Sequence, residues 1–149
     1  MGLLDELRAE HRALEAQSHR LRGMIARDVP DPAGVAVLRS QLAEVLLEHC
    51  QREDRAVYDR LLSSGDAAAT CAAYAFRKDH GGVISIFAQY IEDWPVGRIA
   101  GDWQRFGEAT RTLLAALERR CAGEETTLYR HAERVLGAGR SGETGAVAH

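Results

Sequence analysis

The chain has 149 residues, of which 46% are hydrophobic and 28% charged, and this balance is typical of a single globular domain. The sequence has no apolar run long enough for a membrane span, and a formal net charge of −3 gives no sign of a nucleic-acid partner. The acidic N-terminal residues do not resemble a signal peptide, so we expect the 3 cysteines to be reduced thiols in the cytoplasm.

Apolar residues recur every three or four positions, which predicts an all-α protein. Asp31 is the expected N-cap of the second helix, with Pro32 in its first turn, and Asp102 is the expected cap of the fourth helix. The four helices are predicted near residues 3–27, 32–63, 66–93 and 102–136.

Long amphipathic helices joined by short connections predict an antiparallel up-down four-helix bundle, here in residues 1–137. The following residues, 138–149, are rich in Gly and Ala and show no periodicity. We expect them to form a disordered tail.

Polar side chains interrupt each of the apolar stripes. Burial of such groups costs several kcal/mol unless they are paired or bind a cation. With a helix rise of about 1.5 Å per residue, these polar residues are expected at the same depth along the axis of an antiparallel bundle. Imidazole nitrogens and carboxylate oxygens that converge in this way suit Fe, Mn or Zn. The interrupting residues are His11, His49, Glu53, His80, Arg120 and Glu124.

Two segments of the chain also resemble each other. Residues 49–58 (HCQREDRAVY) and 120–129 (RCAGEETTLY) carry Cys, Glu, a second acid, an aliphatic residue and Tyr at matching places. This repetition suggests a bundle built from two similar halves. Tyr58 and Tyr129 are expected to pack in the core, and a hydrogen bond to a metal ligand is the alternative.

The pattern resembles the hemerythrin-like, or HHE cation-binding, domain over about residues 3–136. The residues that carry the resemblance are His11 in AEHRAL, His49 and Glu53 in LLEHCQREDRAVY, His80 in RKDHGGVI and Glu124 in RCAGEETTLY. The resemblance implies a pair of non-haem iron ions, held by the histidines and bridged by the two carboxylates. It also implies binding of oxygen or nitric oxide, peroxide handling, iron-centre repair, or iron or redox sensing.

Arg120 departs from this pattern, because the family has a histidine at that place. A guanidinium has no lone pair to donate and keeps its positive charge. We therefore expect one iron ion held by His11, His49 and a carboxylate, or an empty site in which Arg120 pairs with Glu53 and Glu124, rather than a symmetrical iron pair.

A slipped register on the fourth helix is the alternative for the missing ligand. Cys121 and Glu125 would then supply a C-x-x-x-E pair, although a thiolate is a soft ligand to find beside carboxylates. Cys50, Cys71 and Cys121 are otherwise expected to be small buried residues. A redox role is the alternative for Cys50 and Cys121, which adjoin the supposed ligands.

Two classes of function remain open from the sequence. One is a metal protein that binds a small diatomic or peroxide ligand, as a sensor, carrier or scavenger. The other is a metal-free bundle that serves as an interaction or regulatory module. An oxidase- or peroxidase-like enzyme is less favoured, because the sequence shows neither an open coordination position nor a substrate pocket.

Overall fold

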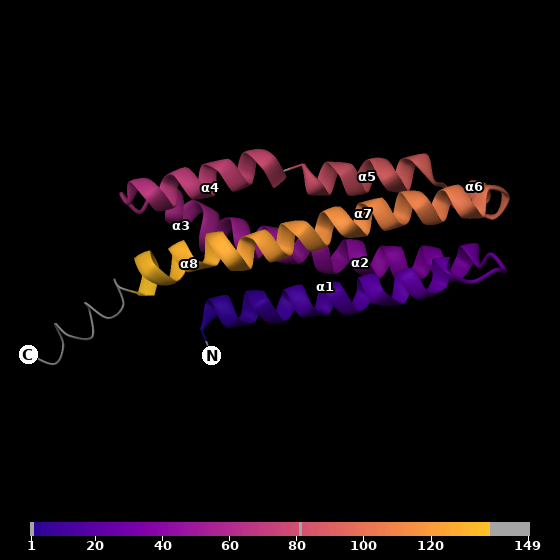
Figure 1. Ribbon diagram of the computed structural model, residues 1–149, viewed down its shortest axis with the longest axis horizontal. Coiled ribbons are helices and arrows are strands. Elements are labelled where there is room, and N and C mark those ends of the chain that lie inside the picture. The colour runs from indigo at the N-terminus through magenta and orange to yellow at the C-terminus, as the bar shows by residue number, and fades with distance from the viewer. Residues whose placement is uncertain (1, 81, 138–149) are drawn as a thin grey trace, which may run out of the picture.

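The computed structural model of the chain describes residues 2–80 and 82–137, and of residues 79 and 80 it describes the backbone only. Four long helical rods lie side by side in alternating directions, and the N-terminus and the last described helix lie at the same end (Figure 1). The described residues form no strand. This arrangement confirms the predicted antiparallel four-helix bundle. Among the described residues, no helix combines the length and apolar character that a bilayer span requires.

Three of the rods are assembled from several consecutive helical elements. The first rod is α1 (Leu3–Ile25) alone, and the second comprises α2 (Pro32–Glu53), the π-helical turn η1 (Asp54–Tyr58) and α3 (Asp59–Leu62). The third comprises α4 (Ala67–His80) and α5 (Val83–Asp93), followed by α6 (Val96–Ile99) and the 3-10 turn η2 (Ala100–Asp102) as a connection. The fourth comprises α7 (Trp103–Gly123), the π-helical turn η3 (Glu124–Leu128), α8 (Tyr129–Ala132) and the π-helical turn η4 (Glu133–Gly137).

Polar caps fix where two of the rods begin. The Asp31 carboxylate accepts a hydrogen bond from the Gly34 amide at 3.0 Å, as predicted, and the Asp66 carboxylate accepts one from the Ala69 amide at 2.9 Å. Gly65, with a φ of 78°, supplies the left-handed residue that the turn before α4 requires.

The predicted boundaries need three corrections. The first helix ends at Ile25 instead of residue 27. The third rod is not one helix, because α4 ends before the glycine pair at 81–82, and glycine disfavours a helix interior. Asp102 makes no capping hydrogen bond, since its side chain lies 3.6 Å from Arg98 instead. The tail expected in residues 138–149 lies outside the described residues.

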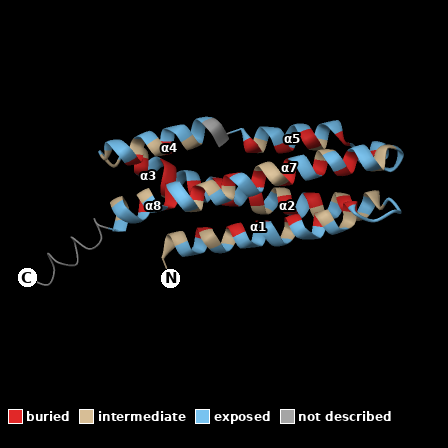
Figure 2. Ribbon diagram, in the orientation of Figure 1, coloured by how far each residue is buried: buried red, intermediate tan, exposed pale blue. Residues whose placement is uncertain are grey.

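The apolar core is divided into two clusters along the bundle. Buried residues recur along the rods (Figure 2). One cluster, towards the α6 end, includes Leu14, Leu46 and Leu117, and the other, near the termini, includes Leu7, Val57 and Leu128. On α1 and on the second and fourth rods, buried polar residues lie between these positions: His11, His49, Glu53, Arg120 and Glu124. A single charged layer therefore separates the two apolar clusters.

Candidate metal centre

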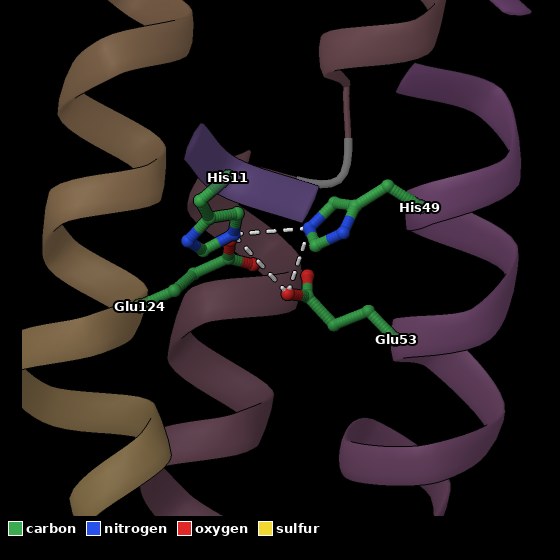
Figure 3. Close-up of side chains that lie close together, drawn as sticks. All are labelled: His11, His49, Glu53 and Glu124. Carbon is green, nitrogen blue, oxygen red and sulfur yellow. Dashed lines mark hydrogen bonds and ion pairs between the residues drawn. The ribbon is translucent and has the colours of Figure 1, made fainter. Parts of the chain in front are cut away.

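Four side chains of the polar layer converge from three rods. His11 comes from α1, His49 and Glu53 from α2, and Glu124 from the first position of η3 (Figure 3). Each offers one ligand atom, and these atoms all lie within 4.8 Å of one another. None of the four residues is more than 5% exposed. We call these four residues the His/Glu cluster.

The spacing of the donor atoms suits a single metal ion. His11 Nε2 lies 3.0 Å from His49 Nε2 and 3.2 Å from Glu124 Oε1, and His49 Nε2 lies 3.1 Å from Glu53 Oε2. Two ligand atoms that each lie about 2.1 Å from one ion are about 3 Å apart when their bonds meet at a right angle. A set of two imidazoles and two carboxylates also has the chemistry that first-row divalent metals accept. The residues present therefore fit a bound cation.

Two π-helical turns begin at the carboxylates of the cluster. Glu53 directly precedes η1, and Glu124 is the first residue of η3. In a π-helix the backbone hydrogen bonds join residues five apart, so such residues lie nearly above one another. The tyrosines five residues after each glutamate, Tyr58 and Tyr129, consequently face the polar layer. The sequence similarity between residues 49–58 and 120–129 thus reflects a shared local structure.

Each tyrosine binds the carboxylate of the other rod. The Tyr129 hydroxyl donates a hydrogen bond to Glu53 Oε2 at 2.5 Å, and the Tyr58 hydroxyl donates one to Glu124 Oε2 at 3.0 Å. Both tyrosines are about 1% exposed or less. The hydrogen bond that the sequence offered only as an alternative is therefore present, and it fixes the orientation of both carboxylates.

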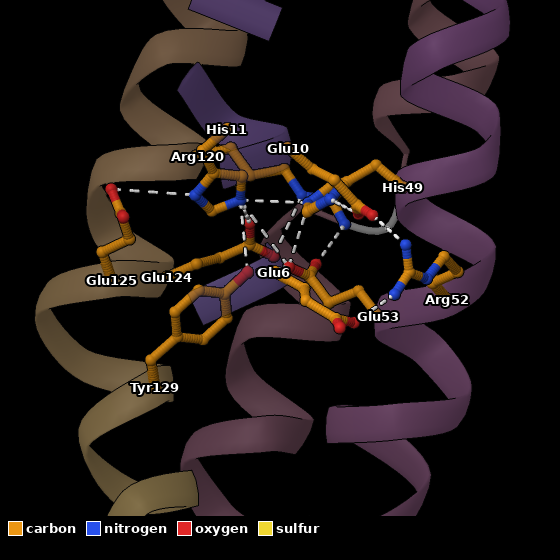
Figure 4. Close-up of polar contacts among 10 residues, drawn as sticks. All are labelled: Glu6, Glu10, His11, His49, Arg52, Glu53, Arg120, Glu124, Glu125 and Tyr129. Carbon is orange, nitrogen blue, oxygen red and sulfur yellow. Dashed lines mark hydrogen bonds and ion pairs between the residues drawn. The ribbon is translucent and has the colours of Figure 1, made fainter. Parts of the chain in front are cut away.

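A carboxylate outside the cluster orients His49. Glu10 Oε1 lies 2.8 Å from His49 Nδ1, and the second oxygen of Glu10 is hydrogen-bonded to Arg52, which also binds Glu6 at 2.8 Å (Figure 4). A proton on Nδ1, shared with Glu10, leaves the lone pair of Nε2 directed into the cluster. Glu10 was not predicted from the sequence. The only feature that could have indicated it is its position next to His11, on the helix that faces α2.

Arg120 contacts both carboxylates of the cluster. Its Nη2 lies 3.6 Å from Glu53 Oε1, and its Nε lies 3.4 Å from Glu124 Oε2. The side chain is 9% exposed. The guanidinium thus balances part of the negative charge that two buried carboxylates bring into the layer, as expected from the sequence.

The surroundings shift the pKa values of the cluster. Burial alone would lower the pKa of His11, but hydrogen bonds with Cys121, Glu124 and Glu53 raise it to about 12. The pKa of His49 is also raised, against the effect of burial, chiefly by Glu53. Burial and the neighbouring Glu53 raise the pKa of Glu124 to about 7, whereas the pKa of Glu53 is lowered despite its burial by hydrogen bonds with Glu124 and the histidines. Without a metal, the cluster therefore holds protons at neutral pH.

The remaining candidates are not members of the His/Glu cluster, and the side chain of one of them is not described. His80 ends α4, and its side chain is not among those described. Glu125 Oε2 lies 3.7 Å from His11 Nδ1, on the opposite side of the imidazole from Glu53 and Glu124 (Figure 4). Cys121 contributes to the raised pKa of His11. Of the three cysteines, Cys50 is buried as expected, whereas Cys71 is exposed and Cys121 partly exposed, which corrects the expectation of burial for both.

The family described as the hemerythrin HHE cation binding domain matches residues 2–132. Comparison with curated proteins gives no match, and comparison with solved structures gives none. The matched range includes all four residues of the His/Glu cluster and both π-helical turns that follow its glutamates. The chain therefore belongs to the hemerythrin HHE cation binding domain family.

Proposed function

We propose that this chain binds one non-haem iron ion through His11, His49, Glu53 and Glu124, and that Arg120 replaces the second ion of an iron pair. The observation that supports this most is the convergence of four buried donor atoms within 4.8 Å, next to a guanidinium paired with both carboxylates. The guanidinium of Arg120 places beside the two carboxylates the positive charge that a second iron ion would otherwise supply.

The proposed role is to bind a small ligand such as oxygen, nitric oxide or peroxide, for sensing, transport or removal. Iron held by imidazoles and carboxylates supplies a coordination position for such a ligand. The protein holds His49 through Glu10 and the two carboxylates through Tyr58 and Tyr129. Burial of the cluster excludes bulk water, and the Tyr129 hydroxyl, whose proton is donated to Glu53, lies 3.3 Å from His11 Nε2.

Spectroscopy of the iron-loaded protein tests this proposal. We expect the anaerobic ferrous protein to change its visible absorption when nitric oxide is added. His49→Ala should lose both the iron and the change, because it removes a buried nitrogen donor. His19→Ala is the matched control, since His19 is an exposed histidine of α1 outside the cluster, and it should behave as the wild type.

The ion pairs of Arg120 also favour a second candidate, a metal-free bundle that acts as an interaction module. In that case Arg120 and the protonated histidines would neutralise Glu53 and Glu124 without a metal. Wild-type protein that takes up no iron and remains fully folded would support this candidate instead.

A further inference from the structure

The His/Glu cluster is buried, so a cation needs a path to reach it. A cavity of about 390 Å³ lies between α1 and α7 and extends to His11. Four other cavities include none of the cluster residues. The cavity beside His11 therefore connects the surface with a residue of the cluster.

The polar lining of this cavity is mostly acidic. Glu15, Glu118 and Glu125 contribute three carboxylates, against the guanidinium of Arg12 and the protonated imidazole of His11. Glu118 is paired with Arg22 at 3.0 Å, whereas Glu125 lies deeper, 3.7 Å from His11 Nδ1. The carboxylates extend from the rim of the cavity to the imidazole, and their charge attracts a cation and repels an anion.

Two buried polar atoms that line the cavity make no hydrogen bond with the described residues. They are Nδ1 of His11 and Oγ of Ser18, which belong to residues 5% and 1% exposed. The two residues are seven positions apart on α1, or about 10 Å along the helix. Buried groups of this kind usually have partners. A hydroxyl oxygen can accept a hydrogen bond from the water of a hydrated cation, and an imidazole nitrogen can do so once it has lost its proton.

We propose that this cavity is the entrance through which a divalent cation reaches the His/Glu cluster, with Glu125 and Cys121 as its transient ligands beside His11. The inference rests on the proposed function, since it assumes that the cluster binds a metal. Cys121 is partly exposed and lines the cavity together with Glu125 and His11, so a thiol, a carboxylate and an imidazole lie at its inner end. On the other side of the same imidazole, Nε2 faces Glu53 and Glu124.

The rate of metal uptake tests the entrance separately from the site. Ala122 is exposed and lines the cavity, and Ala122→Arg places a bulky cation there. Ala88→Arg, an exposed position of α5 outside the cavity, is the control with the same change in charge. The probe is Co²⁺ added to the metal-free protein, with uptake followed by stopped-flow absorption and the end point by metal analysis.

We expect Ala122→Arg to slow Co²⁺ uptake by about tenfold or more and to leave the final Co²⁺ content unchanged, while Ala88→Arg stays within about twofold of the wild type. Glu125→Gln should slow uptake by about threefold or more relative to Glu44→Gln, which removes an exposed carboxylate of α2. If each variant took up Co²⁺ at the same rate as its control, the cavity would not be the entrance, and the proposed function would be unaffected. Wild-type protein that takes up no Co²⁺ would overturn both.

If Ala122→Arg does not fold, alkylation of Cys121 gives a second test. In a Cys71→Ser background, iodoacetamide should react at the partly exposed Cys121, because Cys50 is buried and burial raises its pKa to about 12. Alkylated protein should take up Co²⁺ about tenfold more slowly than untreated protein. Unchanged uptake after complete alkylation would contradict the entrance.

Discussion

Tyr129 donates a hydrogen bond across the bundle to Glu53, with 2.5 Å between the hydroxyl oxygen and Glu53 Oε2. Tyr58 makes the reciprocal bond to Glu124 at 3.0 Å. Each tyrosine follows the glutamate of its own rod by five residues and binds the glutamate of the other rod. The two rods are thus joined through the polar layer, and the carboxylates keep a fixed orientation before any cation arrives.

Removal of the Tyr129 hydroxyl should destabilise the metal-free protein. Tyr129→Phe leaves Glu53 buried with one fewer donor, so we expect the free energy of unfolding to fall by about 1–3 kcal/mol in urea denaturation. Tyr74→Phe, at a 66% exposed tyrosine, is the matched control and should cost much less. Equal stability of the two variants would show that the bond to Glu53 contributes nothing.

Replacement of Arg120 should increase the metal content. Arg120→His removes a permanent cation beside Glu53 and Glu124 and adds a nitrogen donor. We expect iron per chain to rise towards two, with new oxo-bridge absorption in the oxidised protein. Arg119→His makes the same change at the adjacent exposed position and should leave the iron content as in the wild type. If neither variant bound a second iron, the role given to Arg120 would be contradicted.

Removal of the Glu10 carboxylate should weaken metal binding without removing a ligand. Glu10→Gln replaces the carboxylate that accepts the Nδ1 proton of His49 with a neutral amide, so this hydrogen bond becomes weaker. We therefore expect the affinity for Fe²⁺ to fall by about tenfold or more in a chelator competition. Glu6→Gln is the control, because Glu6 also binds Arg52 but, within the described residues, makes no hydrogen bond with His49. The account of His49 would be wrong if both variants bound Fe²⁺ equally.

Metal affinity should rise with pH. In the metal-free protein the pKa of His11 is raised to about 12, that of Glu124 to about 7, and that of His49 in the same direction. Iron requires the deprotonated ligands, so binding releases protons, and each released proton makes the affinity increase about tenfold per pH unit. Fe²⁺ titrations at pH 6, 7 and 8 should therefore show an affinity that increases by about 100-fold or more over this range.

The stability of the metal-free protein should change in the opposite direction. A raised folded-state pKa at His11 contributes stability that is complete below the unfolded value of about 6.5 and is lost as the pH rises towards about 12. Thermal unfolding from pH 6.5 to 9 should show a decreasing midpoint for the metal-free protein. A midpoint that increased over this range would contradict the protonated state assigned to His11.

The sequence was sufficient to predict most of the fold, because the signals were local. Apolar periodicity defined the helices, and Asp31 with Pro32 marked the start of one of them correctly. Counting residues from the helix ends placed His11, His49 and Glu124 at one level, and their donor atoms do converge. Depth along a bundle is predictable because the rise per residue of a helix is constant.

Features that depend on packing could not be predicted from the sequence. The residues of η1 and η3 have no amino-acid composition that would distinguish a π-helix from an α-helix. The repeated spacing of five residues from Glu to Tyr is consistent with a π-helical turn. The contact from Glu10 to His49 depends on how closely α1 packs on α2, which no spacing within one helix reveals. The ion pairs of Arg120 were anticipated only because its position departs from the family pattern.

The iron content of the wild-type protein distinguishes a site for one ion from an iron pair and from an empty site. Metal-free protein would be loaded with excess Fe²⁺ under anaerobic conditions and desalted, and iron would be measured per chain by elemental analysis. Our account predicts one iron per chain in the wild type and none in His49→Ala, because four converging donors suit one ion and Arg120 supplies the neighbouring positive charge. Two irons per wild-type chain, or none in a folded protein, would contradict it.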